Sequence, residues 1–239
     1  MSDFINTLLF GIYPYIALVV LILGTVVRYD REPYTWKSGS SQLLRRKQLV
    51  WGSVLFHVGV LVIFFGHLIG LLTPIAIFDA MGISHGAKQL LAIIAGGVAG
   101  IMAIIGATLL VHRRLFDARV RAASSTTDTL IIVLLWVQLA LGLLTIPVSL
   151  QHLDGHEMVK FMTWAQGIFT FNDAASSYVA DASIIFKLHL VVGLTILLLF
   201  PFTRLVHMLS VPVRYMWRPG YQVVRERNRR AAPTRIPAE

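Results

Sequence analysis

Four histidines lie within two long apolar stretches of this 239-residue chain, two in each stretch. His189 and His207 are eighteen positions apart in the stretch 184–207. At about 3.6 residues per turn this spacing is about five whole turns, so one continuous helix would present both imidazoles on one face, about 27 Å apart. His57 and His67 are ten positions apart in the other stretch, or about 15 Å along a helix. This pattern predicts two sites in which a cofactor lies between paired imidazoles.

The chemistry open to such pairs is limited because the chain has no cysteine. Disulfides, thiolate-held iron–sulfur clusters and the covalent attachment of c-type haem are therefore excluded. A haem would have to be held non-covalently, with histidine as the main axial ligand available. Copper or zinc is disfavoured, because the two pairs are far apart and neither has a third ligand.

The elements that carry these histidines are predicted membrane spans. Hydrophobic residues make up 56% of the chain and its mean hydropathy is +0.71, which is too apolar for an ordinary soluble domain. The first apolar run lacks the basic start and the cleavage site of a signal peptide. We predict an all-α integral membrane protein with five transmembrane helices, each near the length of about 20 residues that a span requires. The runs are residues 8–27, 50–72, 89–111, 130–150 and 184–205.

The distribution of positive charge predicts the orientation of these spans. The chain carries a net charge of +9, and its Lys and Arg residues gather between the first two runs, between the third and fourth, and from Arg204 onward. By the positive-inside rule the N-terminus lies outside (periplasmic) and the C-terminus in the cytoplasm. This pattern favours contact with membrane lipid over nucleic acid. We expect a membrane domain in residues 1–224 and a mobile, basic cytoplasmic tail in residues 225–239.

The second and fifth spans are predicted to cross the membrane in opposite directions, so their histidines can be paired by depth. The inner His57 faces the inner His207, and the outer His67 faces the outer His189. Helix tilt and a kink at Pro201 must absorb the difference between the two axial separations. Because ionisable groups inside a membrane usually mark function, we favour bis-histidine haem. The alternative is four separate polar residues that are hydrogen-bonded within the helix bundle.

Other polar groups near the predicted membrane boundaries are weaker candidates. Arg113 and Arg114 at the inner boundary could contact haem propionates, although positive-inside anchoring explains them equally well. The aromatic segment 151–182 is predicted to cover the outer surface as an amphipathic element. It contains His152 and His156 beside two acids, a set that fits hydrated interfacial residues better than a metal site.

Ordered sequence blocks from about Ile12 to Val224 resemble those of a known family. They include IYPYIA, FHVGV, GHLIGLLTP, HRRLF, LGLLTIPVS and FKLHLVVG. The chain resembles the gamma subunit, a dihaem cytochrome b, of membrane-bound respiratory nitrate reductase. The resemblance implies that His57 and His207 bind the proximal haem b and that His67 and His189 bind the distal haem b. It is weakest in the outer loop 75–87 and after Arg225.

The resemblance also implies an activity, partners and a location in the bacterial cytoplasmic (inner) membrane. Menaquinol or ubiquinol would be oxidised at the outer face, with release of protons there. Electrons would pass through both haems to an iron–sulfur beta subunit and then to a molybdenum-containing alpha subunit that reduces nitrate. The resemblance places a quinol-site lysine at Lys88, and Gly66 beside His67 would leave room for the quinol ring. The other interpretation of Lys88 is an interfacial lysine that extends its ammonium group toward water.

Two other functions remain open. One is the dihaem cytochrome b subunit of another quinone-linked oxidoreductase, such as a formate dehydrogenase or a heterodisulfide reductase-like complex, against which the sequence blocks argue. The other is a haem-free membrane anchor or transporter, which predicts a colourless protein. A reduced-minus-oxidised spectrum would separate the last from both cytochromes, and the catalytic subunit that co-purifies would separate the first two.

Overall fold

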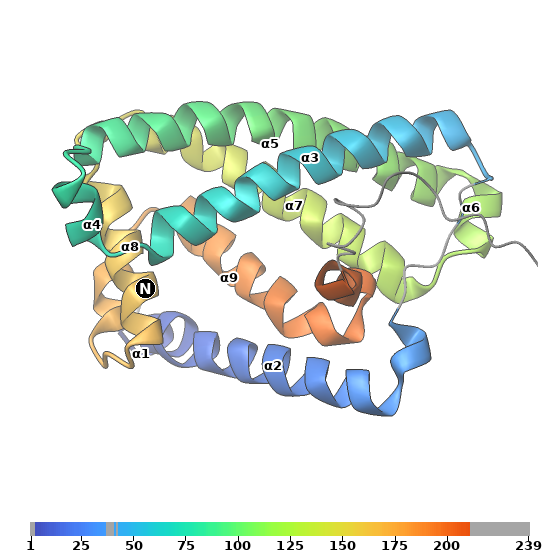
Figure 1. Cartoon of the computed structure of the whole chain (residues 1–239), viewed down its shortest axis with the longest axis horizontal. Coiled ribbons are helices and arrows are strands. Elements are labelled where there is room, and N and C mark those ends of the chain that lie inside the picture. The colour runs from blue at the N-terminus through green and yellow to red at the C-terminus, as the bar shows by residue number, and fades with distance from the viewer. Residues whose placement is uncertain (1–2, 37–40, 42, 211–239) are drawn as a thin grey trace, which may run out of the picture. The chain divides into compact units, whose positions relative to one another are not determined.

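The computed structural model describes residues 3–36, 41 and 43–210, and the regular structure in this part of the chain is helical throughout. Residues 1–207 form one compact unit (Figure 1). The predicted boundary at residue 224 and the predicted tail 225–239 lie outside the described residues. Five helical stretches are long and apolar enough to cross a membrane, as predicted: Asp3–Arg31, Arg46–Leu72, His85–Phe116, Thr126–Ser149 and Ile184–Phe202.

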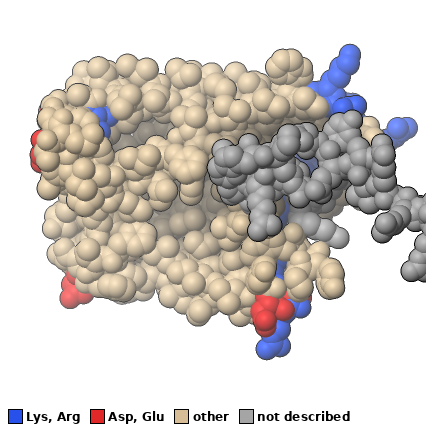
Figure 2. All heavy atoms as spheres, in the orientation of Figure 1, with Lys and Arg blue, Asp and Glu red and all other residues tan. Residues whose placement is uncertain are grey.

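The surface of this unit suits a lipid environment. Large apolar side chains such as Leu23, Phe65 and Leu91 are more than half exposed. In a soluble protein so many exposed apolar groups would be unusual. Figure 2 shows Lys, Arg, Asp and Glu gathered toward the two ends of the face in view, with an uncharged surface between them.

The first span contains a local irregularity at Pro14. It runs from α1 (Asp3–Thr7) through a π-helical turn, η1 (Leu8–Ile12), into α2 (Tyr13–Arg31). Pro14 has no N–H to donate to the carbonyl of Phe10, four residues earlier. The indole Nε1 of Trp164 donates to that oxygen instead, at 2.9 Å. Pro14 therefore leaves an acceptor free for a distant helix.

Helix α3 (Arg46–Leu72), which carries His57 and His67, packs along α5 (His85–Phe116) with α4 (Ile75–Ala80) between them in sequence. Glycines make the contact close. A Cβ added at Gly59 would lie 2.5 Å from the carbonyl oxygen of Ala99, and one at Gly106 would lie 2.3 Å from the amide nitrogen of Phe56. Small residues at such contacts let helix backbones approach each other in membranes. This contact fixes α3 and therefore both of its histidines.

Helix α7 (Thr126–Ser149) packs against α5 on one side and α9 (Ile184–Leu199) on the other. It follows the short helix α6 (Ala118–Ala122). Its first turn is capped by Ser125, whose side chain accepts from the backbone N–H of Asp128. This cap fixes where α7 begins and so places the Asp128 carboxylate at the end of the bundle.

The segment predicted as an amphipathic cover contains α8 (His156–Phe169) and a 3₁₀ turn, η3 (Ala175–Val179). One face of α8 packs Phe161, Trp164 and Ile168 into a core with Phe10. The side-chain amide of Gln166 donates to the carbonyl oxygens of Leu71 and Thr73 at the end of α3. The expected amphipathic helix is present, and other parts of the chain cover its apolar face.

The prediction of one continuous helix from 184 to 207 is wrong. Helix α9 ends at Leu199, and two 3₁₀ segments follow, η4 (Phe200–Phe202) and η5 (Arg204–Ser210). Pro201 has no N–H for the helical hydrogen-bond ladder. Thr203 between the two segments is extended, with φ −119° and ψ −179°. His207 therefore lies on a separate short element, and the count of five whole turns does not apply to it.

Candidate bis-histidine sites

Two pairs of imidazoles lie close together, and each pair joins α3 to the fifth span. The ring centres of His57 on α3 and His207 on η5 are 6.4 Å apart, with planes at 71°. Those of His67 on α3 and His189 on α9 are 6.3 Å apart, with planes at 43°. The structure thus brings together the same two pairs that depth in the membrane predicts.

Both separations fit an ion that lies between two imidazoles. A metal ion lies about 2 Å from a ligating ring nitrogen, which is itself about 1.1 Å from the ring centre, so two opposed rings have centres about 6 Å apart. The observed ring-centre separations of 6.4 and 6.3 Å are close to this value. Each pair is therefore spaced as two ligands of one ion would be.

Three of the four imidazoles are oriented by a backbone carbonyl. The Nδ1 atom of His57 lies 2.7 Å from the oxygen of Ser53, and that of His67 lies 2.9 Å from the oxygen of Ile63. His207 makes the corresponding contact with the oxygen of Arg204 at 2.5 Å. A carbonyl can only accept, so each Nδ1 must carry the hydrogen, which leaves the Nε2 lone pair for a metal. This second interaction is characteristic of histidines that bind metals.

His189 is held differently, by helix α7. Its Nε2 atom lies 3.3 Å from the side-chain nitrogen of Gln138. The ring lies close to Gly142, because a Cβ there would be 3.1 Å from the imidazole Cε1. The sequence alone did not identify the contact of Gln138 with His189. The one indication was a side-chain amide within an otherwise apolar span.

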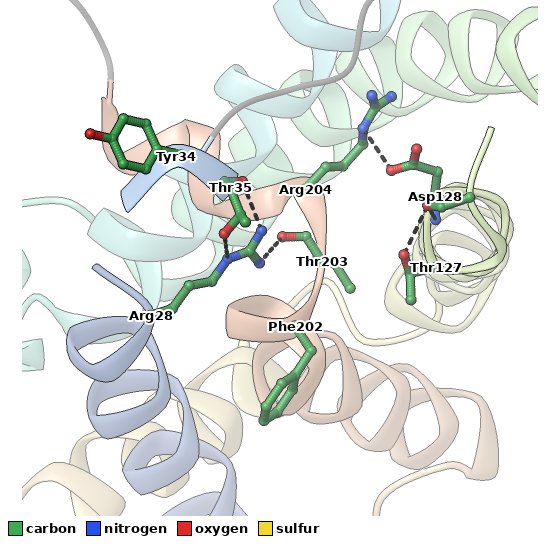
Figure 3. A pocket seen from close by; sticks show the side chains of 9 residues that line it. Arg28, Tyr34, Thr35, Thr127, Asp128, Phe202, Thr203 and Arg204 are labelled. Carbon is green, nitrogen blue, oxygen red and sulfur yellow. Dashed lines mark hydrogen bonds and ion pairs between the residues drawn. The ribbon is translucent and has the colours of Figure 1, made fainter. Parts of the chain in front are cut away.

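Two more residues missed in the sequence lie near the segment that carries His207. A pocket of about 420 Å³ lies next to the break in the fifth span. Arg28 at the end of α2, Asp128 at the start of α7 and Arg204 at the start of η5 line it (Figure 3). Arg28 donates to the carbonyl oxygens of Pro201 and Thr203. Asp128 forms an ion pair with Arg204. Arg28 and Asp128 therefore both contact the segment that follows the end of α9.

Arg113 and Arg114 have partners within the chain. Arg113 is only 2% exposed. Its Nη2 donates to the carbonyl oxygens of Ser41 and Leu44 at 2.6 and 2.7 Å. Arg114 lies 3.5 Å from the carboxylate of Asp128. These contacts join the loop before α3 and the start of α7 to the end of α5. The contacts of both arginines with haem propionates stay predictions.

Lys88 is buried in the first turns of α5, with an exposed fraction of 6%. Its Nζ atom lies 2.8 Å from the sulfur of Met162 and 4.0 Å from the centre of the Phe78 ring. The alternative of a lysine that reaches toward water does not fit this burial. At Gly66 a Cβ would meet no atom within 4 Å, so there is open space next to His67. The contacts of both residues with quinol stay predictions.

The acidic and histidine residues of the segment 151–182 serve local structure. The carboxylate of Asp154 accepts from the backbone N–H of His156. Lys160 donates to Glu157 at 3.0 Å and to Asp181 at 2.7 Å. The hydrogen bond with Asp181 raises the pKa of Lys160, and the same bond lowers the pKa of Asp181. In the described part of the chain, no three His, Asp or Glu side chains are grouped so as to hold a metal ion.

Known proteins similar to this chain match almost its whole length. Residues 6–227 match the family described as nitrate reductase gamma subunit. The chain is 50% identical over 226 residues to the respiratory nitrate reductase 1 gamma chain of Escherichia coli strain K12, covering 95% of this chain and 100% of the relative. It is 48% identical over 227 residues to the respiratory nitrate reductase 2 gamma chain of the same strain, with the same coverage. The nitrate reductase gamma chain of Bacillus subtilis strain 168 is 38% identical over 221 residues, which cover 92% of this chain and 98% of the relative.

Proposed function

The chain belongs to the nitrate reductase gamma subunit family, and from this premise we propose that it is the dihaem cytochrome b subunit that oxidises quinol for nitrate reduction. The observation that carries the proposal is the pair of facing imidazoles at each of two depths, with ring centres 6.4 and 6.3 Å apart. His57 and His207 hold the inner, proximal haem b, and His67 and His189 hold the outer, distal haem b. When bound, the haems supply one-electron oxidation and reduction.

The protein's part at these sites is to orient the imidazoles and to surround the pairs with apolar spans. The carbonyls of Ser53, Ile63 and Arg204 hold the Nδ1–H groups, which orients each ring and increases the basicity of its other nitrogen. The apolar spans around the pairs keep the local dielectric low, which is one of the means by which a protein sets a redox potential.

We place quinol oxidation at the outer end, near Lys88. Its ammonium group contacts a thioether and an aromatic ring, both of which are weaker partners than an oxygen atom. A quinol oxygen that reached this position would accept a hydrogen bond from Nζ, and the positive charge would stabilise the oxygen as its proton leaves. The open space at Gly66 would admit the ring. Each quinol gives up two electrons and two protons, and the protons are released outside.

The inner end is proposed to dock the iron–sulfur beta subunit, which passes electrons to the molybdenum-containing alpha subunit where nitrate is reduced. Tyr34 and Leu43 are 89% and 94% exposed in the loop between the first two spans. Aromatic and apolar groups on such a loop favour contact with protein. The complex is expected in the bacterial cytoplasmic membrane, with the N-terminus of this chain outside.

Haem analysis tests the proposal directly. The purified complex should contain two b haems per gamma chain, measured as pyridine haemochrome and extracted by acid acetone. His207→Ala should remove the inner haem and stop the transfer of electrons from quinol to the soluble subunits. A matched control is His152→Ala, since His152 also bonds a carbonyl through Nδ1 but belongs to neither pair. A colourless protein, haem that resists extraction, or full quinol-driven nitrate reduction by His207→Ala would refute the proposal.

A further inference from the structure

The segment that carries His207 is held by the last turns of the first span. After α9 ends, the carbonyl oxygens of Pro201 and Thr203 accept hydrogen bonds from Nη1 of Arg28 at 2.7 and 2.8 Å. The guanidinium of Arg28 is itself fixed, because its Nε and Nη2 donate to the hydroxyl and the carbonyl of Thr35 at 3.2 and 3.0 Å. Figure 3 shows Arg28 between Thr35 and Thr203. A planar group with several N–H donors can bridge these acceptors, whereas a lysine ammonium on its flexible chain cannot reproduce the arrangement.

Close packing one turn earlier in α2 supports the same contact. A Cβ at Gly24 would lie 2.8 Å from the Cγ atom of Pro201. Glycine at this position therefore lets Pro201 lie directly against α2. The proline that ends α9 and the carbonyls that follow it are thus both positioned by the first span.

The other side of the segment is held by the start of α7. Asp128 lies 3.0 Å from Nε of Arg204 and 3.5 Å from Nη1 of Arg114. Arg204 is also the residue whose carbonyl oxygen accepts from Nδ1 of His207. One residue therefore connects the carboxylate of α7 to the imidazole of the inner pair. The hydroxyl of Thr203 adds a local cap, because it accepts from the backbone N–H of Leu205 at 3.3 Å.

We propose that Arg28 and Asp128 are positioning residues for the inner haem ligand His207. They fix the backbone on either side of Thr203 and so set where the imidazole of His207 points relative to that of His57. Neither residue acts on the substrate, and both act through the segment 201–207. The proposal rests on the proposed ligation of haem by His57 and His207.

The test compares the two haems within one complex. Arg28→Lys and Asp128→Asn are made in the full chain with its partner subunits, and the two haems are followed by redox titration of their visible and low-spin EPR signals. The signal that disappears in His207→Ala identifies the inner haem. We expect each variant to shift the midpoint potential and the EPR signal of the inner haem and to leave those of the outer haem unchanged. The more disruptive Arg28→Ala should lose the inner haem and keep the outer one.

Arg45→Lys is the matched control. Arg45 forms an ion pair of 2.6 Å with Asp117, outside the segment that carries His207, so both haem signals should stay as in the unmodified complex. Unchanged inner signals in Arg28→Lys and Asp128→Asn, or equal changes in both haems, would overturn the positioning role. An unmodified complex without haem would instead refute the proposed function on which that role depends.

Discussion

The histidines of the two pairs differ in what surrounds them, and His189 has the least freedom. Its ring lies against Gly142 on α7, where an added Cβ would be 3.1 Å from Cε1. A β-branched side chain at this position would displace the imidazole from its present position. We predict that Gly142→Val loses the outer haem and keeps the inner one, as measured by haem content and by the two EPR signals.

Gly96→Val is the control for that substitution, because a Cβ at Gly96 would meet no atom within 4 Å. It should retain both haems. Two bound haems in Gly142→Val would show that His189 does not need its present position to bind.

A second prediction concerns Lys88. A hydrogen bond from a charged donor contributes about 1.5–3 kcal/mol, which corresponds to a rate change of roughly 10- to 100-fold. Lys88→Met keeps a long apolar side chain in this buried position and removes the charge. We expect both haems to be present and the rate of their reduction by quinol to fall by about this factor, as measured by stopped-flow spectroscopy.

Lys160→Met tests whether any outer lysine has this effect. Lys160 pairs with Glu157 and Asp181, so its loss should leave the quinol rate unchanged. Equal rates in Lys88→Met and the unmodified complex would remove Lys88 from the quinol site.

Among the helices, the contact between α3 and α5 is the one that depends most on the absence of side chains. A Cβ at Gly106 would lie 2.3 Å from the backbone nitrogen of Phe56. Forcing extra atoms into a packed contact costs about 1–3 kcal/mol, and here the clash is with backbone that cannot rotate away. Gly106→Ala should therefore lower the thermal stability of the complex and weaken both haem sites together, because α3 carries a ligand of each. Gly70→Ala, where the added Cβ meets nothing within 4 Å, should behave as the unmodified chain, and equal melting temperatures would contradict the prediction.

The contact of α8 with the loop before α9 should depend on pH. The hydrogen bond with Lys160 lowers the pKa of Asp181 from its ordinary 3.8. The contact is therefore fully present above that ordinary pKa and is lost as the pH falls through the lowered one. We expect protection of the amides in residues 175–182 from hydrogen exchange, corrected for the intrinsic rate, to be constant near neutral pH and to fall only in acid. Asp181→Asn should lack this acid transition, and an identical transition in that variant would assign it to another group.

The sequence was sufficient for the helices and the histidine pairs, and insufficient for the end of the fifth span. Apolar length alone predicts a span, and opposite chain directions pair histidines by depth. By contrast, a proline in a membrane helix can end it or merely bend it. The carbonyl that Pro201 leaves at the end of α9 is bonded by Arg28, a residue 173 positions away. Gln138 and Asp128 could not be assigned for the same reason, because their partners are brought near only by the packed bundle.

For the whole molecule, the predicted orientation in the membrane is open to a direct test by labelling. The absence of cysteine allows single cysteines to report accessibility without background. Phe116→Cys lies at the end of α5 that is predicted inside, and Met81→Cys lies in the loop predicted outside. The side chains that they replace are 72% and 66% exposed. A maleimide that cannot cross membranes should label Met81→Cys in intact cells and Phe116→Cys only after the membrane is opened. The reverse pattern would invert the assignment of the inner and outer haems.

The separate attachment of η5 also has a consequence for how the molecule is made. The inner pair is complete only when His207 has been synthesised and its segment has docked between the first and fourth spans, on Arg28 and Asp128. The outer pair needs nothing beyond His189, which the ribosome adds eighteen residues earlier. A chain truncated after Leu199 would still contain His67 and His189. If the two pairs bind haem as proposed, biogenesis would make the site of His67 and His189 available first. The site of His57 and His207 would become competent last, after all five spans have come together.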